Sequence, residues 1–302
     1  MSQPPDGGGS GLAGGGELVL VSTPIGNLGD LSPRAAEALG TADVVCCEDT
    51  RHTGAMLKRL DISARQLKSL HAHNESLRLP WLLSELASGH TVALVSDAGT
   101  PAVSDPGERL VAAAADAGFR ITVVPGPSAV LAAVVLSGLR LDRWRFEGFL
   151  PRSGPARRGR LADVASSPCP SVCYEAPHRI GATLSDLAAA CGGQRRVAVC
   201  RELTKLHEEV LRTTLAGAAA HFADVAPRGE FVLVVDGVPA EEALQRPSAT
   251  ELAAEVESLV SSGLSRRDAV RDVAVRRGLG RSAVYEAAVK TKPQQGSEAR
   301  DR

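Results

Sequence analysis

The chain of 302 residues has few aromatic side chains, few lysines and no long apolar run. Aromatic residues make up only 3% of it, so we do not expect RNA binding by stacking on many bases. The longest apolar run, residues 129–136, is far shorter than the roughly 20 residues that span a bilayer. Residues 1–16 are rich in glycine and lack the apolar core of a signal peptide, so we expect a disordered tail there. These features predict a cytoplasmic protein without a membrane anchor.

The six cysteines show neither the spacing of zinc ligands nor a disulfide framework. Cys46 and Cys47 lie in an apolar stretch, and we interpret the cysteines as buried thiols in a reducing compartment. We expect no metal site. The formal net charge of −1 provides no overall attraction to nucleic acid, so any RNA contact needs local basic patches.

Two common nucleotide-binding motifs are also absent. No G-x-G-x-x-G follows a predicted strand, and no glycine-rich phosphate loop ends in Gly-Lys-Ser/Thr. Enzymes that use NAD and ordinary nucleoside triphosphatases are therefore disfavoured.

Short apolar runs alternate with helical patterns from Glu17 to Val124, which predicts a largely parallel α/β sheet covered on both faces. Ser32-Pro33 and Asp105-Pro106-Gly107-Glu108 are typical helix starts, with Ser32 and Asp105 as the caps. After residue 126 the strands follow one another with fewer helices, which predicts a mixed sheet. These later strands are expected at 144–149, 171–174, 195–200, 207–214 and 230–235.

The predicted organisation is an α/β protein of two domains with a small helical addition. A capping box at Ser248–Glu251 opens the first of three short helical patterns, which resemble a helix-turn-helix. The expected boundaries are a tail at 1–16, an N-terminal domain at 17–125, a second domain at 126–238, a linker at 239–247, a helical unit at 248–291 and a tail at 292–302.

Small-residue turns follow three of the predicted strands. They are Thr23–Leu28, Ser96–Pro101 and Pro125–Ala129, and open α/β sheets bind ligands at such carboxyl ends. Tight strand-to-helix turns with no ligand are the alternative. Clusters of mixed charge follow further strands at Glu48–Thr53, Tyr174–Arg179 and Arg201–Lys205. Each cluster could be a salt-bridged surface turn, but charges beside a buried sheet are costly unless they are paired or used.

Taken in order, these segments resemble one family. Pro-Ile-Gly-Asn-Leu at 24–28, Glu-Asp-Thr-Arg-His-Thr at 48–53 and Ser-Asp-Ala-Gly-Thr-Pro at 96–101 are the most specific matches. The chain resembles, over residues 17–290, the 16S rRNA (cytidine-2′-O)-methyltransferases of the tetrapyrrole methylase superfamily. The resemblance implies two α/β domains with S-adenosylmethionine held between them, and a C-terminal helical unit like that of the rRNA enzymes.

The same resemblance implies methyl transfer to the ribose of a cytidine, C1402 of 16S rRNA in the 30S subunit. No metal would be required, because the sulfonium donor is already activated. The cofactor-binding residues carried over are Pro24, Asp97, Ala98, Gly99, Thr100, Pro101, Ser128 and Ala129, with Tyr174, Glu175 and Ala176 as further candidates.

Candidates for the chemistry are the polar residues of the charged clusters. They are Glu48, Asp49, Arg51, His52, Glu202 and Lys205, and we favour Glu48 or Asp49 as the group that accepts the hydroxyl proton. Arg51 and His52 could hold RNA phosphate instead.

A basic loop after the strand that ends near Leu150 is the candidate RNA contact. Its arginines are Arg152, Arg157, Arg158 and Arg160, and a solvated loop is the alternative in a chain so rich in arginine. Arginines of the helical unit form a second basic patch. They are Arg266, Arg267, Arg271, Arg276, Arg277 and Arg281.

Two other functions compete with rRNA methylation. One is a methylase of the same superfamily that acts on a tetrapyrrole or a protein side chain, against which the basic loop and helical unit argue. The other is a non-catalytic RNA-binding assembly factor, against which the small-residue turns argue. The superfamily resemblance also implies a homodimer.

Overall fold

The computed structural model describes residues 15–223, 227–239, 247–277 and 279–290. The predicted tails and most of the predicted linker at 239–247 lie outside these residues. By its Cα packing the chain divides into two compact parts. The first part contains the residues up to Gly138, together with Ala198–Leu211 and Gly229–Leu233, and the rest of the chain forms the second part.

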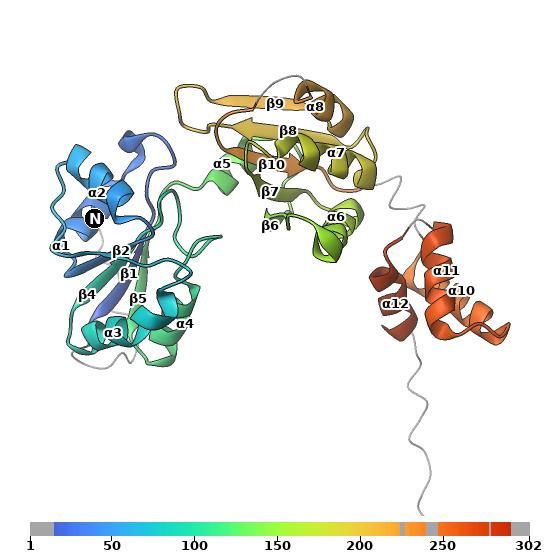
Figure 1. Ribbon diagram of the computed structural model, residues 1–302, viewed down its shortest axis with the longest axis horizontal. Helices are drawn as coiled ribbons and strands as arrows, with labels where there is room; N and C mark the ends of the chain where they lie inside the picture. Colours follow the sequence, from blue (N-terminus) through green and yellow to red (C-terminus); the bar gives the residue numbers. More distant parts are fainter. Residues whose placement is uncertain (1–14, 224–226, 240–246, 278, 291–302) are drawn as a thin grey trace, which may run out of the picture. The chain divides into compact units, whose positions relative to one another are not determined.

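The first sheet is entirely parallel, as predicted. Its strands run in the order β3-β2-β4-β1-β5, and every pairing between neighbours is parallel (Figure 1). The strands are β1 (Glu17–Val21), β2 (Val44–Cys47), β3 (Leu67–Ser69), β4 (Thr91–Leu94) and β5 (Arg120–Val124). The sequence did not predict β3, which is only three residues long.

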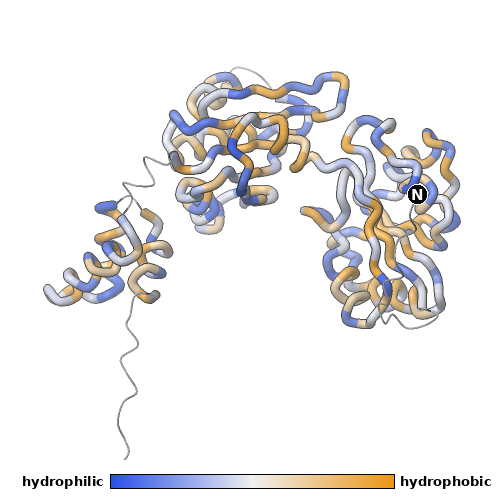
Figure 2. Tube along the Cα trace, turned by 180° about the vertical axis from the view of Figure 1, so that it is seen from behind, coloured by the Kyte–Doolittle hydropathy of each residue, from blue (hydrophilic) through white to orange (hydrophobic). Residues whose placement is uncertain are grey.

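Helices cover both faces of this sheet because alternate residues of each strand point to opposite sides. Val45 and Cys47 pack on one side with helices α1 (Pro33–Thr41) and α2 (Thr50–Arg59). Val44 and Cys46 pack on the other side with α3 (Glu75–Ala87) and α4 (Glu108–Asp116). Both thiols are fully buried, as expected, and burial raises the pKa of Cys46 to about 12. Figure 2 shows the apolar character concentrated along these strands.

The helices that connect the strands of the first sheet change from one face of the sheet to the other, and β4 lies at this change. The helices that follow β1 and β2 lie on one face, and the helix that follows β4 lies on the opposite face. β4 itself lies between β2 and β1. The loop that leaves β4 therefore departs from its two neighbours, which is where open α/β sheets bind ligands.

Helix α4 begins later than the sequence predicted. Its N-cap is Gly107, with φ of 124°, and the predicted cap Asp105 lies outside the helix. The cap is supplied from a distance, because one carboxylate oxygen of buried Glu75 accepts hydrogen bonds from the backbone N–H groups of Arg109 and Leu110 at 3.1 and 3.2 Å. This long-range cap leaves the Asp105 carboxyl available for other contacts.

The second sheet is mixed, which confirms the prediction. Its order is β6-β7-β10-β8-β9, with β6 (Arg145–Phe149), β7 (Ser171–Glu175), β8 (Arg196–Arg201), β9 (Glu209–Thr214) and β10 (Phe231–Val235). β6 and β7 are parallel, with a register shift at Glu147. β8 and β10 are antiparallel, because Glu202 N bonds Glu230 O while Asp236 N bonds Arg196 O.

The remaining helices include some that the sequence analysis did not identify. These remaining helices are α5 (Ala129–Leu136), α6 (Gly154–Ser166), α7 (Ile180–Cys191) and α8 (Leu215–His221), and neither α6 nor α7 was predicted from the sequence. Ser128 caps α5, since its hydroxyl accepts from Leu131 N. Within the described residues, no helix has the length and apolar character needed to cross a membrane.

The C-terminal helical unit consists of α10 (Ala249–Ser261), α11 (Arg266–Arg277) and α12 (Arg281–Lys290). The predicted capping box is present at its start, because Ser248 and Glu251 each bond the other's backbone N–H. Val256, Val273 and Val284 are buried together at its centre. These three valines come from α10, α11 and α12, and further buried residues of all three helices surround them. The unit therefore has an apolar core of its own.

Candidate functional site

Two of the small-residue turns are joined directly by their backbones. The N–H of Thr23 bonds the carbonyl of Gly99 at 2.9 Å, and the N–H of Gly99 bonds the carbonyl of Thr23 at 3.1 Å. The buried Thr23 hydroxyl also donates to the carbonyl of Ser96 at 3.1 Å. These bonds fix the exit of β1 against the exit of β4, within the first compact part.

The turn after β5 joins the same assembly. The hydroxyls of Ser22 and Thr100 lie 3.3 Å apart, and Thr100 lies 3.5 Å from the carbonyl of Pro127. A Cβ on Gly126 would lie 3.0 Å from the Cβ of Ser22, and Gly99 has φ of 85°. Side chains at these two glycines would separate the turns or strain the backbone, so the small residues are needed for this close approach.

Asp97 connects these turns to the loop after β2. One of its carboxylate oxygens accepts from the backbone N–H of Asp49 at 3.1 Å. Among the described residues, no basic side chain pairs with Asp97. A half-buried carboxylate of this kind can still accept hydrogen bonds from a ligand's ammonium or hydroxyl groups.

A cavity of about 1130 Å³ opens beside these turns, in the first compact part. It is bordered by the loop after β1, helix α2, the loop after β4 and the β8–β9 loop. Its lining residues are Pro24, Ile25, Gly26, Asn27, Leu28, His52, Ala55, Met56, Arg59, Asp97, Ala98, Thr204, Lys205, Leu206 and Glu230. Pro24, His52, Asp97, Ala98 and Lys205 were all predicted as site residues, and the fold brings them together here.

Asp49 is held in a capping role. Its carboxylate accepts from the backbone N–H of Arg51 at 2.8 Å and from the Arg51 guanidinium at 3.1 and 2.7 Å. The Arg51 side-chain bonds, followed by the backbone bond, hold the pKa of Asp49 well below its usual range. Asp49 is therefore a weak proton acceptor, and the ion pair also occupies Arg51. The structure thus argues against Asp49 as the base, while the role predicted for Glu48 stays a prediction.

Lys205 remains a cation in this geometry. Partial burial alone would lower the pKa of Lys205, but hydrogen bonds at 2.9 Å to Glu202 and to Glu230 outweigh it and raise the pKa. The Lys205 stem packs on Gly26, where an added Cβ would lie 2.4 Å from Lys205 Cγ. Lys205 can thus contribute positive charge to the cavity, but it is not suited to accept a proton.

Asp105 is a site candidate that the sequence analysis missed. Burial, followed by the negative charges of Glu48 and Asp97, raises the pKa of Asp105 to about 6. The loop that carries it includes Ala102 and Ser104, both with positive φ, at 65° and 66°. Strained backbone of this kind is concentrated at functional sites. The sequence pattern favoured a helix cap at Asp105, and that interpretation concealed the carboxyl.

The carboxyls of Glu48, Asp97 and Asp105 are not grouped closely enough to hold a metal ion together. Across the described part of the chain, no three side chains of His, Cys, Asp or Glu are grouped so that they could hold a metal ion.

In the second compact part, the predicted candidates Tyr174, Glu175 and Ala176 lie at the end of β7. Tyr174 packs against the rings of Phe146 and Phe149, at centroid distances of 5.1 and 5.4 Å. The Glu175 carboxylate is buried and accepts from Thr183 at 2.6 Å and from Ala176 N at 2.9 Å. Glu175 is thus committed to bonds within its own part of the chain.

The basic segment after β6 is a helix, so the prediction of a loop is wrong. Gly154 and Pro155 open α6, in which Pro occupies a favoured first-turn position. Arg157 is buried and donates to Asp186 at 2.8 Å, to Thr183 at 3.0 Å and to the carbonyl of Pro151 at 2.9 Å. These bonds commit Arg157 to the protein interior.

The other arginines of this segment differ in their surroundings. Arg160 pairs with buried Glu147 at 2.6 Å. Arg152 and Arg158 are exposed. Of the four predicted RNA contacts, the geometry therefore leaves Arg152 and Arg158 as the ones that face solvent.

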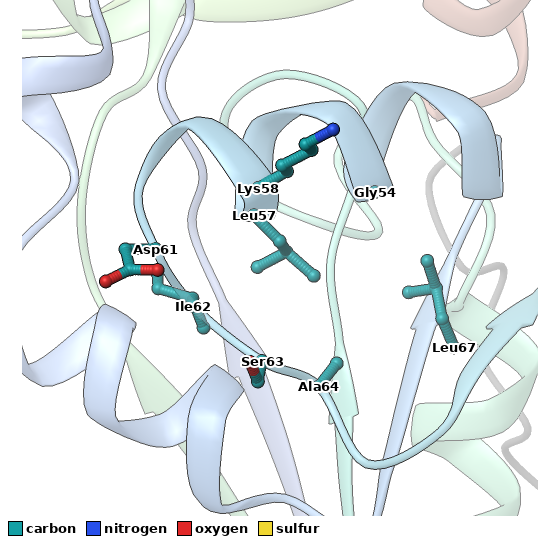
Figure 3. A pocket seen from close by; sticks show the side chains of 8 residues that line it. All are labelled: Gly54, Leu57, Lys58, Asp61, Ile62, Ser63, Ala64 and Leu67. Carbon is teal, nitrogen blue, oxygen red and sulfur yellow. The ribbon is translucent and has the colours of Figure 1, made fainter.

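A smaller hollow of about 340 Å³ lies between the end of α2 and β3. Leu57 extends from α2 between Ile62 and Leu67 (Figure 3). None of the predicted site residues lines it, so it contributes nothing to the site described above.

The fold and its small-residue turns define a class of protein. Residues 17–219 match the family described as Tetrapyrrole (Corrin/Porphyrin) Methylases, and the chain belongs to this family. The expected fold and class are confirmed, and the chain is a methyltransferase.

Among curated proteins, the chain is similar to Ribosomal RNA small subunit methyltransferase I of Synechocystis sp., with 46% identity over 90% of this chain and 96% of that protein. The protein of the same name from Mycobacterium bovis is 44% identical over 94% of this chain and 98% of that protein. Among solved structures, uroporphyrin-III C-methyl transferase from Thermus thermophilus, complexed with S-adenyl homocysteine, aligns with a TM-score of 0.51. It is 19% identical and covers 72% of this chain and 97% of that chain.

Replacing Arg157 with Ala should destabilise the protein, because Asp186 and buried Thr183 lose their charged donor. Asp186 is 47% exposed, so the main cost comes from the acceptors at Thr183 and Pro151, at about 1–3 kcal/mol each, and we expect the free energy of unfolding to fall by about 3 kcal/mol in urea denaturation. The matched control is Arg158→Ala, one residue away and exposed, for which the change should stay within about 0.5 kcal/mol. Equal effects of the two substitutions would contradict the buried network.

Replacing Asp105 with Asn should change how stability depends on pH. Since the folded state raises the pKa of Asp105 from 3.8 to about 6, folded protein binds this proton more tightly than unfolded protein. In the wild type this contribution to stability is present below about pH 4 and is lost as pH rises through about 6. Asp105→Asn should therefore match the wild-type Tm at pH 4 and exceed it at pH 7.5, as measured by calorimetry.

The control for this experiment is Asp116→Asn, at the exposed end of α4. It should shift Tm by a similar amount at both pH values. If the Tm of Asp105→Asn minus that of the wild type is no larger at pH 7.5 than at pH 4, the raised pKa of Asp105 is contradicted.

Proposed function

We propose that this protein transfers the methyl group of S-adenosylmethionine to the ribose 2′-hydroxyl of a cytidine in 16S rRNA, on the 30S subunit. The observation that carries the proposal is the cavity lined by Asp97 and by two small-residue turns, those after β1 and β4, whose backbones are joined to each other. The names of the relatives, which are similar along nearly the whole chain, support an rRNA substrate.

The residues around this cavity fit S-adenosylmethionine. The joined turns at Thr23, Gly99 and Thr100 present backbone close to the cavity, and Pro24 and Ala98 line it. Asp97 has the charge to accept hydrogen bonds from the amino group or a ribose hydroxyl of the cofactor. A volume of about 1130 Å³ leaves room for an acceptor nucleotide as well. The S-adenosyl homocysteine in the Thermus thermophilus structure supports this choice of cofactor.

When bound, S-adenosylmethionine supplies an electrophilic methyl group on a positively charged sulfur. The tasks of the protein are to align the ribose oxygen with that methyl group, to exclude water and to accept the hydroxyl proton. We assign the proton to Asp105 or Glu48. A carboxyl with a pKa of about 6 is a stronger base than an ordinary one while still being ionised at neutral pH.

Basic residues that line the cavity suit an RNA acceptor. They are Lys205, Arg59 and His52, and His52 and Arg59 are exposed. The Arg59 guanidinium can attract and position phosphate without reading sequence, whereas Lys205 is already paired with Glu202 and Glu230. Glu202 contributes indirectly, because its carboxylate holds the Lys205 ammonium at 2.9 Å.

A tetrapyrrole acceptor is the second candidate, because the family includes tetrapyrrole methylases. The extent of similarity argues against it. The relatives from Synechocystis sp. and Mycobacterium bovis match 90% and 94% of this chain, whereas uroporphyrin-III C-methyl transferase aligns with 72% of it over nearly its full length. The additional part of this chain is therefore shared with the rRNA enzymes.

The purified protein should transfer a labelled methyl group from S-adenosylmethionine to 30S subunits from cells that lack this gene. Nucleoside mass spectrometry should then show 2′-O-methylcytidine. A methyl group on a base, or no transfer, would reject the proposed chemistry.

Asp97→Ala should weaken S-adenosylmethionine binding about 10- to 100-fold by calorimetry, as expected for loss of a charged hydrogen bond. The control Asp116→Ala should bind normally.

We also propose that the protein is a homodimer. β5 is an edge strand of the first sheet and leaves Val123 52% exposed. Leu131 and Val135 lie one turn apart on α5, 55% and 72% exposed. Light scattering should give twice the chain mass, and Val135→Glu should shift it toward the monomer mass. A wild-type monomer at micromolar concentration would exclude this proposal.

A further inference from the structure

A basic hollow on the C-terminal helical unit has no role in the site described above. It has a volume of about 1130 Å³ and is formed by the start of α11 and by α12. Its lining residues are Ser265, Arg266, Arg267, Asp268, Val270, Arg271, Arg281, Ser282, Tyr285 and Glu286. We propose that this hollow binds a segment of RNA other than the methylated nucleotide, with phosphates on Arg267 and Arg281 and a base on Tyr285. The inference rests on the proposed function, because it takes the substrate to be rRNA.

The charges of the helical unit are distributed unevenly: α10 has carboxylates and no basic residue, whereas α11 and α12 carry the arginines together with Asp268, Asp272 and Glu286. The acidic residues Glu251, Glu255 and Glu257 belong to α10, whereas the arginines belong to α11 and α12. Four arginines line the hollow against one aspartate and one glutamate. A near-neutral chain thus carries a local surface that attracts polyanions.

Ion pairs distinguish the arginines of the unit from one another. Arg266 pairs with Glu257, Arg271 with Asp268, Arg276 with Asp272 and Arg277 with Glu255. Within the described residues, Arg267 and Arg281 form no such pair. Both are exposed, so binding a phosphate would not require them to give up an internal partner.

Tyr285 gives the hollow an aromatic surface. It lies four residues after Arg281 on α12, so the two side chains share one helix face. Tyr285 is 56% exposed. The only other tyrosine of the chain, Tyr174, packs between Phe146 and Phe149. An exposed ring next to an unpaired guanidinium suits an unstacked base joined to its phosphate.

Three features thus coincide in one hollow: unpaired cations, an exposed ring and a volume that can accommodate nucleotides. An acidic protein segment would pair with the arginines, but its carboxylates would not stack on the Tyr285 ring. The combination therefore favours single-stranded RNA, or the loop of a folded RNA, as the occupant.

The experiment measures binding of the full-length protein to protein-free 16S rRNA and to 30S subunits, both without the methyl group. Arg267→Glu and Arg281→Glu should each weaken binding at least fivefold at 0.1 M salt. Each should also reduce the slope of log K against log salt by about 1, as expected for one lost phosphate contact. The matched control is Arg276→Glu, on the same unit but outside the hollow, which should bind within twofold of the wild type.

Tyr285 is tested by a pair of substitutions. Tyr285→Ala should weaken binding roughly tenfold through loss of stacking, and Tyr285→Phe should restore it because the ring is retained. Circular dichroism and S-adenosylmethionine affinity should be unchanged in every variant, which separates loss of binding from loss of folding. Weakened binding to 30S subunits with normal binding to free 16S rRNA would overturn the inference in favour of a ribosomal protein.

The methyl-transfer assay separates this inference from the proposed function. If the wild type methylates 30S subunits and the hollow variants bind normally, the inference fails and the function stands. If the wild type transfers no methyl group while Arg267→Glu and Tyr285→Ala still lose RNA binding, the function fails and the hollow stands as an RNA site.

Discussion

The backbone pairing of Thr23 with Gly99 is the constraint on which the candidate site depends. It joins the ends of β1 and β4, the strands at which the sheet's connections change direction. This pairing requires a residue at position 99 that tolerates positive φ, which glycine does. The neighbouring turn requires glycine at position 126, because a Cβ there would crowd Ser22. Because most residues of these turns are small, the proposed recognition of the cofactor depends on backbone groups and on Asp97.

Ion pairing then decides which charged residues can take part in chemistry. Arg51 lowers the pKa of Asp49, and Glu202 and Glu230 raise the pKa of Lys205. Asp49 therefore stays an anion and Lys205 a cation. Asp105 behaves differently: burial, followed by the negative charges of Glu48 and Asp97, outweighs a hydrogen bond with Ser96 and raises the pKa of Asp105 toward neutrality. The site thus contains fixed charges for positioning and one carboxyl whose protonation can change near neutral pH.

The sequence predicted what local pattern controls and missed what distant contacts control. Four of the five strands of the first sheet, the cap at Ser32 and the capping box at Ser248 depend on neighbours within a few residues, and they are present as predicted. The cap of α4 comes from Glu75, more than 30 residues away, so Asp105 was mistaken for it. Arg157 was grouped with its exposed neighbours because its partners, Thr183 and Asp186, follow much later in the chain.

The same reasoning explains why arginine content alone could not locate an RNA contact. In the helical unit, most of the arginines neutralise carboxylates on their own or a neighbouring helix, and in α6 Arg157 and Arg160 do the same. An arginine engaged in this way would have to exchange one anion for another in order to bind phosphate, which yields little net free energy. Arg267 and Arg281, which form no ion pair within the described residues, do not have to exchange such a partner for phosphate. Thus the distribution of the carboxylates, more than the number of arginines, determines which surface of this protein is basic.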